Sequence, residues 1–153
     1  MKKNIIKKLI YLDVCALCRP FDDQSYLRIK LETEAVNLII AKIKEGIYNF
    51  VVSPVHFKEI KAITEEIEQI HLLSFLDKYG IKVKINPKEA MKRAEELLKL
   101  KFGIADAAHV AFSEIAGAEF ISCDDQLLKK CKKNKIKIWC GNPVDFCLKE
   151  DLK

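Results

Sequence analysis

The chain has 153 residues, of which 50% are apolar and 32% charged, and its net charge is +5. This length suits one domain with a substantial core, and the composition excludes a mainly disordered chain. No apolar run approaches the ~20 residues of a membrane span, and the apolar stretch of the basic start is too brief for a signal peptide, so we expect one cytoplasmic domain over residues 1–153.

The first predicted element is a buried strand. Residues 9–14 are almost entirely apolar, which is typical of a strand covered on both faces, and residues 19–23 have the composition of a loop. Asp13 is therefore expected near the carboxyl end of this strand.

A crossover connection is predicted next. Apolar residues recur at helical spacing from Leu31 to Ile43, and Gly46 is placed to end that helix before a second strand at residues 48–52. The order strand, helix, strand indicates two parallel strands joined by a helix.

The middle of the chain is predicted to be mainly helical. Ser53 followed by Pro54 is typical of a helix start, with Ser53 as the N-cap, and Glu59 is expected close to the beginning of that helix. Residues 64–101 contain two further helical patterns, which Gly80 separates.

The last third repeats the alternation. A helix rich in small residues over 104–111 carries Asp106 in its first turn. Residues 119–123 read as a strand that ends at Asp124, and after another helix residues 136–140 read as a last strand before a closing helix. We therefore predict an α/β fold with three layers, α/β/α, and a central, mainly parallel sheet, whose ligand site lies beyond the carboxyl ends of the strands.

Four acidic residues, Asp13, Glu59, Asp106 and Asp124, lie where a strand ends or a helix begins. Carboxylates gathered at one sheet edge repel each other, and a divalent cation commonly holds such a group together. Each residue alone also has a plainer interpretation: Asp13 and Asp124 could cap backbone N–H groups, and Glu59 could be a solvated helix residue. Asp106 is harder to explain in that way, because it lies among alanines on a helix expected to be buried.

Other polar residues leave two readings open. Arg19 could clamp a phosphate or pair with Asp22. His109 could orient a carboxylate, although a packed structural histidine is favoured, and His56 and His71 are expected at the surface. A lysine cluster could meet nucleic-acid phosphates or be a solvated face; its members are Lys129, Lys130, Lys132, Lys133, Lys135 and Lys137.

The six cysteines favour buried thiols over a disulfide framework, because the chain has ample core and only one close pair. Cys15 and Cys18 have the spacing of half a zinc site, but no second pair follows at zinc-finger spacing.

Together these segments resemble the PIN domain, the nuclease fold of the VapC-type toxins of bacterial and archaeal toxin–antitoxin pairs. The stretches that carry the resemblance are Leu9–Asp13, Val52–Glu59, Gly103–Ala111, Ala118–Asp124 and Ile136–Pro143. The metal-binding acids of the family match Asp13, Glu59, Asp106 and Asp124, and Ser122 matches a hydroxyl position. Asp125 adjoins Asp124, and either could face the site. After the first acid, Val14 and Cys15 stand where many relatives have small polar residues.

The resemblance implies a metal-dependent endoribonuclease in which the four carboxylates hold one or two Mg²⁺ or Mn²⁺ ions. It also implies an RNA substrate, a toxin role with a small antitoxin as partner, and a homodimer. Two alternatives stay open: a catalytically silent PIN fold that binds RNA or protein, and an RNA-processing nuclease outside a toxin–antitoxin pair. A phosphatase or receiver domain with Asp13 as phosphoryl acceptor is less favoured, and no G-x-G-x-x-G motif supports dinucleotide binding.

Overall fold

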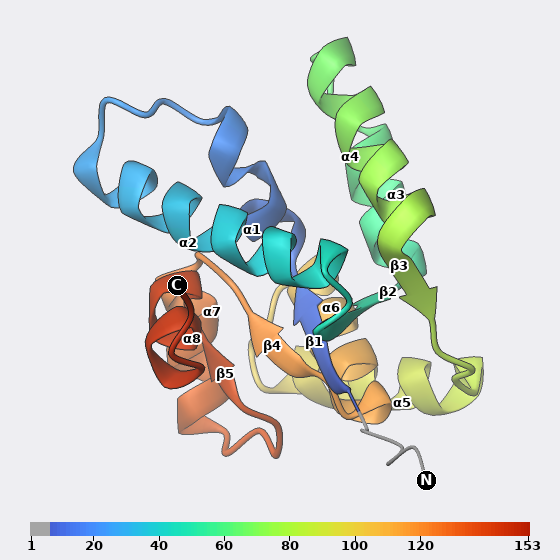
Figure 1. Cartoon of the computed structure of the whole chain (residues 1–153). Coiled ribbons are helices and arrows are strands. Elements are labelled where there is room, and N and C mark those ends of the chain that lie inside the picture. Colours follow the sequence, from blue (N-terminus) through green and yellow to red (C-terminus); the bar gives the residue numbers. More distant parts are fainter. Residues whose placement is uncertain (1–6) are drawn as a thin grey trace, which may run out of the picture.

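The computed structural model describes residues 7–153, and their backbone forms an α/β fold of three layers (Figure 1). Five strands pair in the order β3-β2-β1-β4-β5, and every pairing is parallel. Helices cover both faces of the sheet, so the predicted three-layer architecture is confirmed. The first six residues, which hold most of the basic start considered as a signal peptide, lie outside the described part of the chain.

The strands are β1 (Lys8–Leu12), β2 (Tyr48–Val52), β3 (Gly80–Lys82), β4 (Glu119–Ile121) and β5 (Cys140–Gly141). The helices are α1 (Val14–Cys18), α2 (Leu27–Lys44), α3 (Pro54–Lys61), α4 (Glu66–Tyr79), α5 (Pro87–Lys99), α6 (Ile104–Ala116), α7 (Asp125–Lys133) and α8 (Pro143–Lys149). A 3₁₀ turn, η1 (Arg19–Phe21), follows α1.

The central strand β1 sends alternate side chains into two separate cores. Ile10 and Leu12 pack in the core with α1, α2, α4 and α8, whereas Tyr11 packs in the core with α5, α6 and α7. This alternation follows from the two-residue period of a strand. Because both faces are covered, the strand is apolar in every residue after Lys8, as parallel strands usually are.

The chain reverses its direction of travel across the sheet at β1. After β1 it adds β2 and then β3 on one side, and only later β4 and β5 on the other. In parallel sheets such a reversal opens a crevice at the carboxyl ends of the strands, where ligands commonly bind. Asp13 lies at this point, and its backbone N–H donates to the carbonyl of Ile121 across 3.1 Å.

Several predicted elements are confirmed closely. The second strand spans residues 48–52, Ser53 is the N-cap of α3, and Pro54 is its first residue. Gly46 follows α2 with a positive φ of 79°. This left-handed conformation favours glycine and ends the helix.

Three strand predictions were too long. The strand predicted over residues 119–123 ends at Ile121, as β4. β1 ends at Leu12 rather than residue 14, because Asp13 caps a new helix that begins at Val14. The last strand was predicted over residues 136–140 but holds only Cys140–Gly141. Lys135 has a positive φ of 50°, so the chain turns just before this segment. It pairs with β4 only at Cys140 and Gly141.

The predicted loop after α1 is also partly wrong, since its first three residues form η1. No helix within residues 7–153 has both the length and the apolar character needed to cross a bilayer.

Candidate carboxylate site at the carboxyl edge of the sheet

Asp13 is a buried carboxylate, with 4% of its surface exposed. Its Oδ1 accepts hydrogen bonds from the backbone N–H of Ala16 at 3.1 Å and from the thiol of Cys15 at 2.9 Å. The capping role considered for Asp13 is therefore present. Burial raises the pKa of Asp13 above its ordinary value, while the Cys15 thiol and the Ser122 hydroxyl oppose that rise. Burial of Asp13 thus disfavours its ionised form.

Asp106 lies in the first turn of α6, as predicted, and is half-buried. Burial raises its pKa above the ordinary value, and the negative charges of Asp124, Asp13 and Glu59 raise it further. These three residues come from the starts of α7 and α1 and from α3. Asp13, Glu59 and Asp124 therefore lie near enough to Asp106 to disfavour its ionised form. We call Asp13, Glu59, Asp106 and Asp124 the carboxylate site.

Glu59 is held by a hydrogen-bonded chain that starts in the sheet. It is the sixth residue of the eight in α3, so its predicted place near the start of the helix was wrong. Its carboxylate accepts a hydrogen bond from Nε2 of buried His109. Nδ1 of His109 lies 2.5 Å from the hydroxyl of Tyr11, which lies 2.7 Å from Oγ of Ser53.

His109 therefore has both roles that the sequence left open: its ring is packed in the interior, and it contacts a carboxylate. Because a carboxylate can only accept, Nε2 carries the proton. In the neutral ring Nδ1 is then the acceptor for the hydroxyl of Tyr11. Tyr11 itself was not predicted as a site residue, since an aromatic residue within an apolar strand reads as core.

His56 was predicted at the surface, and this was wrong: its side chain is fully buried. The backbone N–H of Ser53 donates to Nδ1 of His56 at 3.0 Å, so Nε2 is the protonated nitrogen and donates to the carbonyl of Leu12 at 2.6 Å. Burial lowers the pKa of His56 to about 3, which keeps the ring neutral. His56 thus ties the end of β1, next to Asp13, to the start of α3.

The choice between Asp124 and Asp125 is settled by their partners. Oδ1 of Asp124 caps α7, accepting from the backbone N–H groups of Gln126 at 3.0 Å and Leu127 at 3.2 Å. Asp125 is exposed and forms a two-bond pair with Arg28, at 2.6 and 2.8 Å. Asp124 is therefore the residue that acts on Asp106.

Ser122 is fully buried beneath this turn. Its Oγ accepts from the backbone N–H of Asp124 at 3.0 Å and lies 3.6 Å from Sγ of Cys15. Ser122 therefore connects the two segments that carry Asp124 and Asp13. Cys15 occupies a place where a small polar residue was expected, and its thiol serves as a donor there.

Arg19 is engaged within its own loop. Its guanidinium bonds Asp22 at 2.9 Å and buried Glu32 at 3.2 Å. Of the two readings that the sequence allowed, pairing with Asp22 is the one present. The remaining predicted polar residues are placed more simply: His71 is exposed, as predicted, and all six cysteines, each within the described residues, are free thiols.

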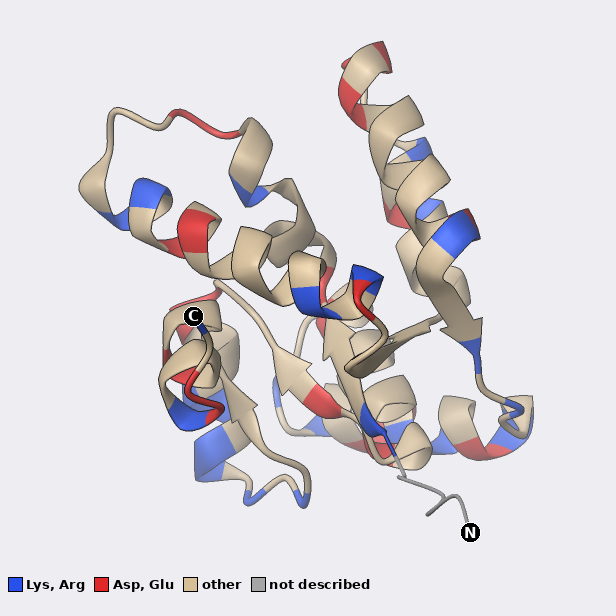
Figure 2. Cartoon of the chain, in the orientation of Figure 1, with Lys and Arg blue, Asp and Glu red and all other residues tan. Residues whose placement is uncertain are grey.

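The lysine cluster lies along α7 and the loop that follows it (Figure 2). All of its members except Lys130 are exposed, and Nζ of Lys130 donates to the carbonyl of Lys101 at 2.9 Å. This placement is compatible with a solvated face and with phosphate contacts alike.

The chemistry of the carboxylate site fits a hard divalent cation. Carboxylate oxygens are the ligands that Mg²⁺ and Mn²⁺ prefer. Among residues 7–153, however, no three His, Cys, Asp or Glu side chains stand close enough together to hold an ion as they are. Capping bonds engage one oxygen each of Asp13 and Asp124, and His109 engages Glu59. Side-chain movement would therefore be needed before these carboxylates could hold an ion together.

Comparison with known proteins gives no family assignment: neither the family models nor the curated proteins include a match to this chain. Support for a function comes from the carboxylate site and from the motifs of the sequence.

Proposed function

We propose that the protein is a metal-dependent endoribonuclease, which hydrolyses RNA phosphodiesters at the carboxylate site with Mg²⁺ or Mn²⁺. The main support is that Asp13 lies at the sheet reversal beside β1 and that the negative charges of Asp13, Glu59 and Asp124, from distant segments, all act on Asp106. Within residues 7–153, neither Asp13, Asp106 nor Asp124 forms an ion pair with a Lys or Arg. Carboxylates without a cationic partner lower the stability of the fold, and binding a metal ion is a reason for a protein to retain them.

The residues of the site have separable roles in this proposal. Asp13, Glu59, Asp106 and Asp124 would hold the metal, and His109 would keep Glu59 oriented until the metal binds. Divalent ions in such a site lower the pKa of water and stabilise the attacking and leaving oxygens of a phosphodiester. Ser122 and Cys15 would keep Asp13 aligned.

The resemblance to VapC-type toxins extends this proposal to a biological role. A toxin would have a small antitoxin partner and would form a homodimer. All four acids of the family pattern are present here, which favours an active nuclease over a silent PIN fold. Expression of the protein should then arrest growth and Asp106→Asn should relieve the arrest; an RNA-processing nuclease without an antitoxin gene beside it would not behave in this way.

Cleavage of single-stranded and structured RNA tests the activity directly. We expect cleavage with Mg²⁺ or Mn²⁺, none with a chelator, and a loss on the order of 100-fold or more in Asp106→Asn. The matched control is Asp125→Asn, which removes a neighbouring charge that pairs with Arg28 instead of facing the site. Its activity should stay near that of the wild type.

A second readout is independent of turnover. Mn²⁺ should raise the melting temperature of the wild type and of Asp125→Asn, but not that of Asp106→Asn. Undiminished cleavage by Asp106→Asn, or equal stabilisation of all three proteins by Mn²⁺, would contradict the proposal.

A further inference from the structure

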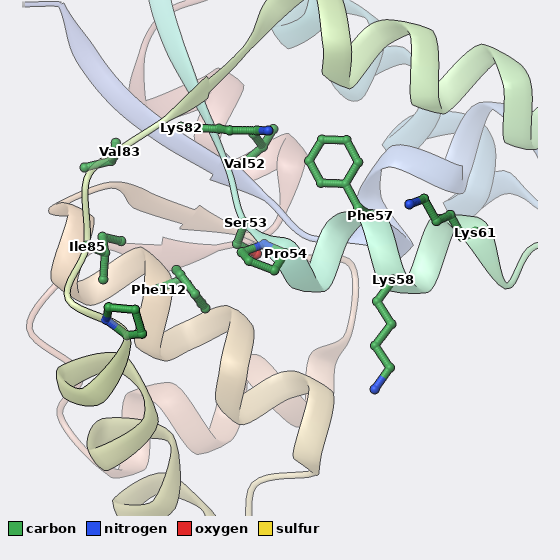
Figure 3. Close-up of a pocket in the computed structure, with 11 residues that line it drawn as sticks. Val52, Ser53, Pro54, Phe57, Lys58, Lys61, Lys82, Val83, Ile85 and Phe112 are labelled. Carbon is green, nitrogen blue, oxygen red and sulfur yellow. The ribbon is translucent and has the colours of Figure 1, made fainter.

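A cavity of about 730 Å³ lies between α3, the segment after β3 and α6 (Figure 3). Its walls are mainly apolar, with Phe57 and Phe112 as the aromatic members, and Ser53 lines it at the end of β2. This volume is typical of sites for small ligands or single groups of a larger ligand.

The charges around the cavity all have one sign. Lys58, Lys61 and Lys82 line it, and no carboxylate does. All three lysines are exposed, and none forms an ion pair with another residue of the described chain. Nζ of Lys82 lies 5.4 Å from the centre of the Phe57 ring. An apolar hollow with a cationic rim suits a ligand that joins a flat apolar body to a negative group.

The cavity shares its supporting helices with the carboxylate site. α3 carries Glu59 as well as Phe57 and Lys58, and α6 carries Asp106 as well as Phe112. Asp106 and Phe112 are six residues apart, which corresponds to about 9 Å along the axis of a helix. Ser53 belongs to both places, because it lines the cavity and begins the hydrogen-bonded chain to Glu59. The two side chains also project from α6 about 120° apart around its axis. The cavity and the carboxylate site therefore lie on different faces of shared helices, and an RNA strand that binds both would have to wrap around them.

We propose that this cavity takes an unpaired base of an RNA strand that wraps around these helices from the phosphate that is cleaved. The base lies against Phe57 and Phe112, and the flanking phosphates meet the three lysines. This inference rests on the proposed function for the identity of the strand as RNA. An apolar peptide from a partner protein would fill the same walls, but it would leave the positive charges unmatched, so the nucleotide is the better fit.

The test is the binding of a short fluorescein-labelled single-stranded RNA in the presence of a chelator, measured by fluorescence anisotropy. Aromatic stacking contributes about 1–3 kcal/mol per base, so Phe57→Ala should weaken binding roughly 5- to 100-fold. The double variant Lys58→Ala/Lys61→Ala should weaken binding and flatten its dependence on salt. The matched control is Lys132→Ala/Lys133→Ala, which removes the same charge from α7 and should change binding far less.

A crosslinking measurement guards against a misfolded Phe57 variant. RNA that carries 4-thiouridine should crosslink the wild-type protein at peptides from α3 or α6 that contain Phe57 or Phe112. Equal losses of binding in the two double variants, or crosslinks confined to α7, would overturn the inference. It would also be overturned if an excess of unlabelled oligonucleotide failed to displace the labelled RNA.

The two proposals can fail separately. Cleavage that needs Asp106 but is insensitive to Phe57, Lys58 and Lys61 would remove the base site and leave the nuclease. Binding at the cavity without any metal-dependent cleavage would remove the nuclease and leave an RNA-binding protein.

Discussion

Asp106 shows how a single side chain can reduce the stability of its own fold. It is half-buried, and three other carboxylates act on it, so its ionised form is disfavoured. A carboxylate whose pKa is raised on folding contributes stability only at low pH, and that contribution is lost as the pH rises through the folded pKa. At neutral pH the charge of Asp106 therefore opposes folding.

We predict that Asp106→Asn is more stable than the wild type in a chelating buffer at pH 7.5, although it lacks activity. Asparagine keeps the shape of the side chain and removes the repulsion from Asp13, Glu59 and Asp124. The expected rise in melting temperature is about 1–3 °C, and circular dichroism can measure it. Asp77→Asn, on the exposed side of α4, is the control and should leave the melting temperature unchanged. A variant less stable than the wild type would argue against the crowding of negative charge.

His56 gives the opposite dependence on pH. Its pKa is lowered from 6.5 to about 3 by burial, so the unfolded chain binds a proton that the folded chain excludes. Stability should therefore fall as the pH drops from 6.5 toward 3, by about 2 kcal/mol at pH 5 from this residue alone.

The variant His56→Gln isolates this effect. Glutamine cannot take up a proton, so the variant should be less stable than the wild type at pH 7 but should lose less stability between pH 7 and pH 5. Urea unfolding at both pH values measures the difference. Parallel losses in the two proteins would show that other groups cause the acid sensitivity.

Among the elements, the junction of α4 and β3 leaves no room for a side chain at Gly80. Gly80 is both the C-cap of α4 and the first residue of β3. A Cβ atom there would lie 2.4 Å from the carbonyl oxygen of Leu76 and 2.6 Å from Cγ1 of Val52. Only glycine lets the helix end directly against β2, and this contact sets the position of the cavity wall that follows.

Gly80→Ala should therefore destabilise the protein by about 2–3 kcal/mol through steric overlap with a backbone atom. Gly117→Ala is a matched comparison, because Gly117 has a positive φ of 70° but no atom within 4 Å of an added Cβ. Its cost should be limited to about 1 kcal/mol of backbone strain. Urea midpoints of the two variants test the order, and a larger loss in Gly117→Ala would refute the steric argument.

Charged contacts connect distant parts of the chain. Arg19 and Arg28 both donate to Oε1 of buried Glu32 on α2, at 3.2 and 3.3 Å. Arg28 also reaches Asp125 at the start of α7. This network fixes α2 against η1 on one side and against the segment that carries Asp124 on the other.

Glu32→Ala should cost about 2–3 kcal/mol, because it leaves two guanidinium groups without their buried partner. Asp125→Ala breaks an exposed pair and should cost about 1 kcal/mol or less. Chemical unfolding of both variants checks this difference. Equal costs would indicate that the buried carboxylate contributes no more than a surface pair.

Local patterns predicted much of this fold, and contacts between distant residues account for what was missed. Strand β2 and the Ser53–Pro54 helix start follow from neighbouring residues alone. Buried His56 bonds the carbonyl of Leu12, 44 residues away, and Arg28 pairs with Asp125, 97 residues away. Neither pairing leaves a periodic signal, although the spacing of Ser53 and His56 resembles that of a capping box.

The sequence indicated where three of the four predicted acids lie, but not what surrounds them. Asp13, Asp106 and Asp124 could be placed from strand ends and helix starts. The partners of Glu59 were foreseen only in part: contact of His109 with a carboxylate was one of two readings, whereas Tyr11 looks like a core residue in sequence. Only the packing of α6 against β1 makes them one chain of hydrogen bonds.

The two outermost strands, β3 and β5, contain three and two residues. Edge strands this short present few unpaired backbone N–H and C=O groups to a strand of another molecule. This protects the sheet from fibril formation and strand exchange. Among the described residues, the helices offer more apolar surface for self-association, with exposed Leu27 and Leu31 on α2 and Ile67 and Ile70 on α4. Concentrated solutions of the folded protein should accordingly not form amyloid-like aggregates, which thioflavin T fluorescence can check.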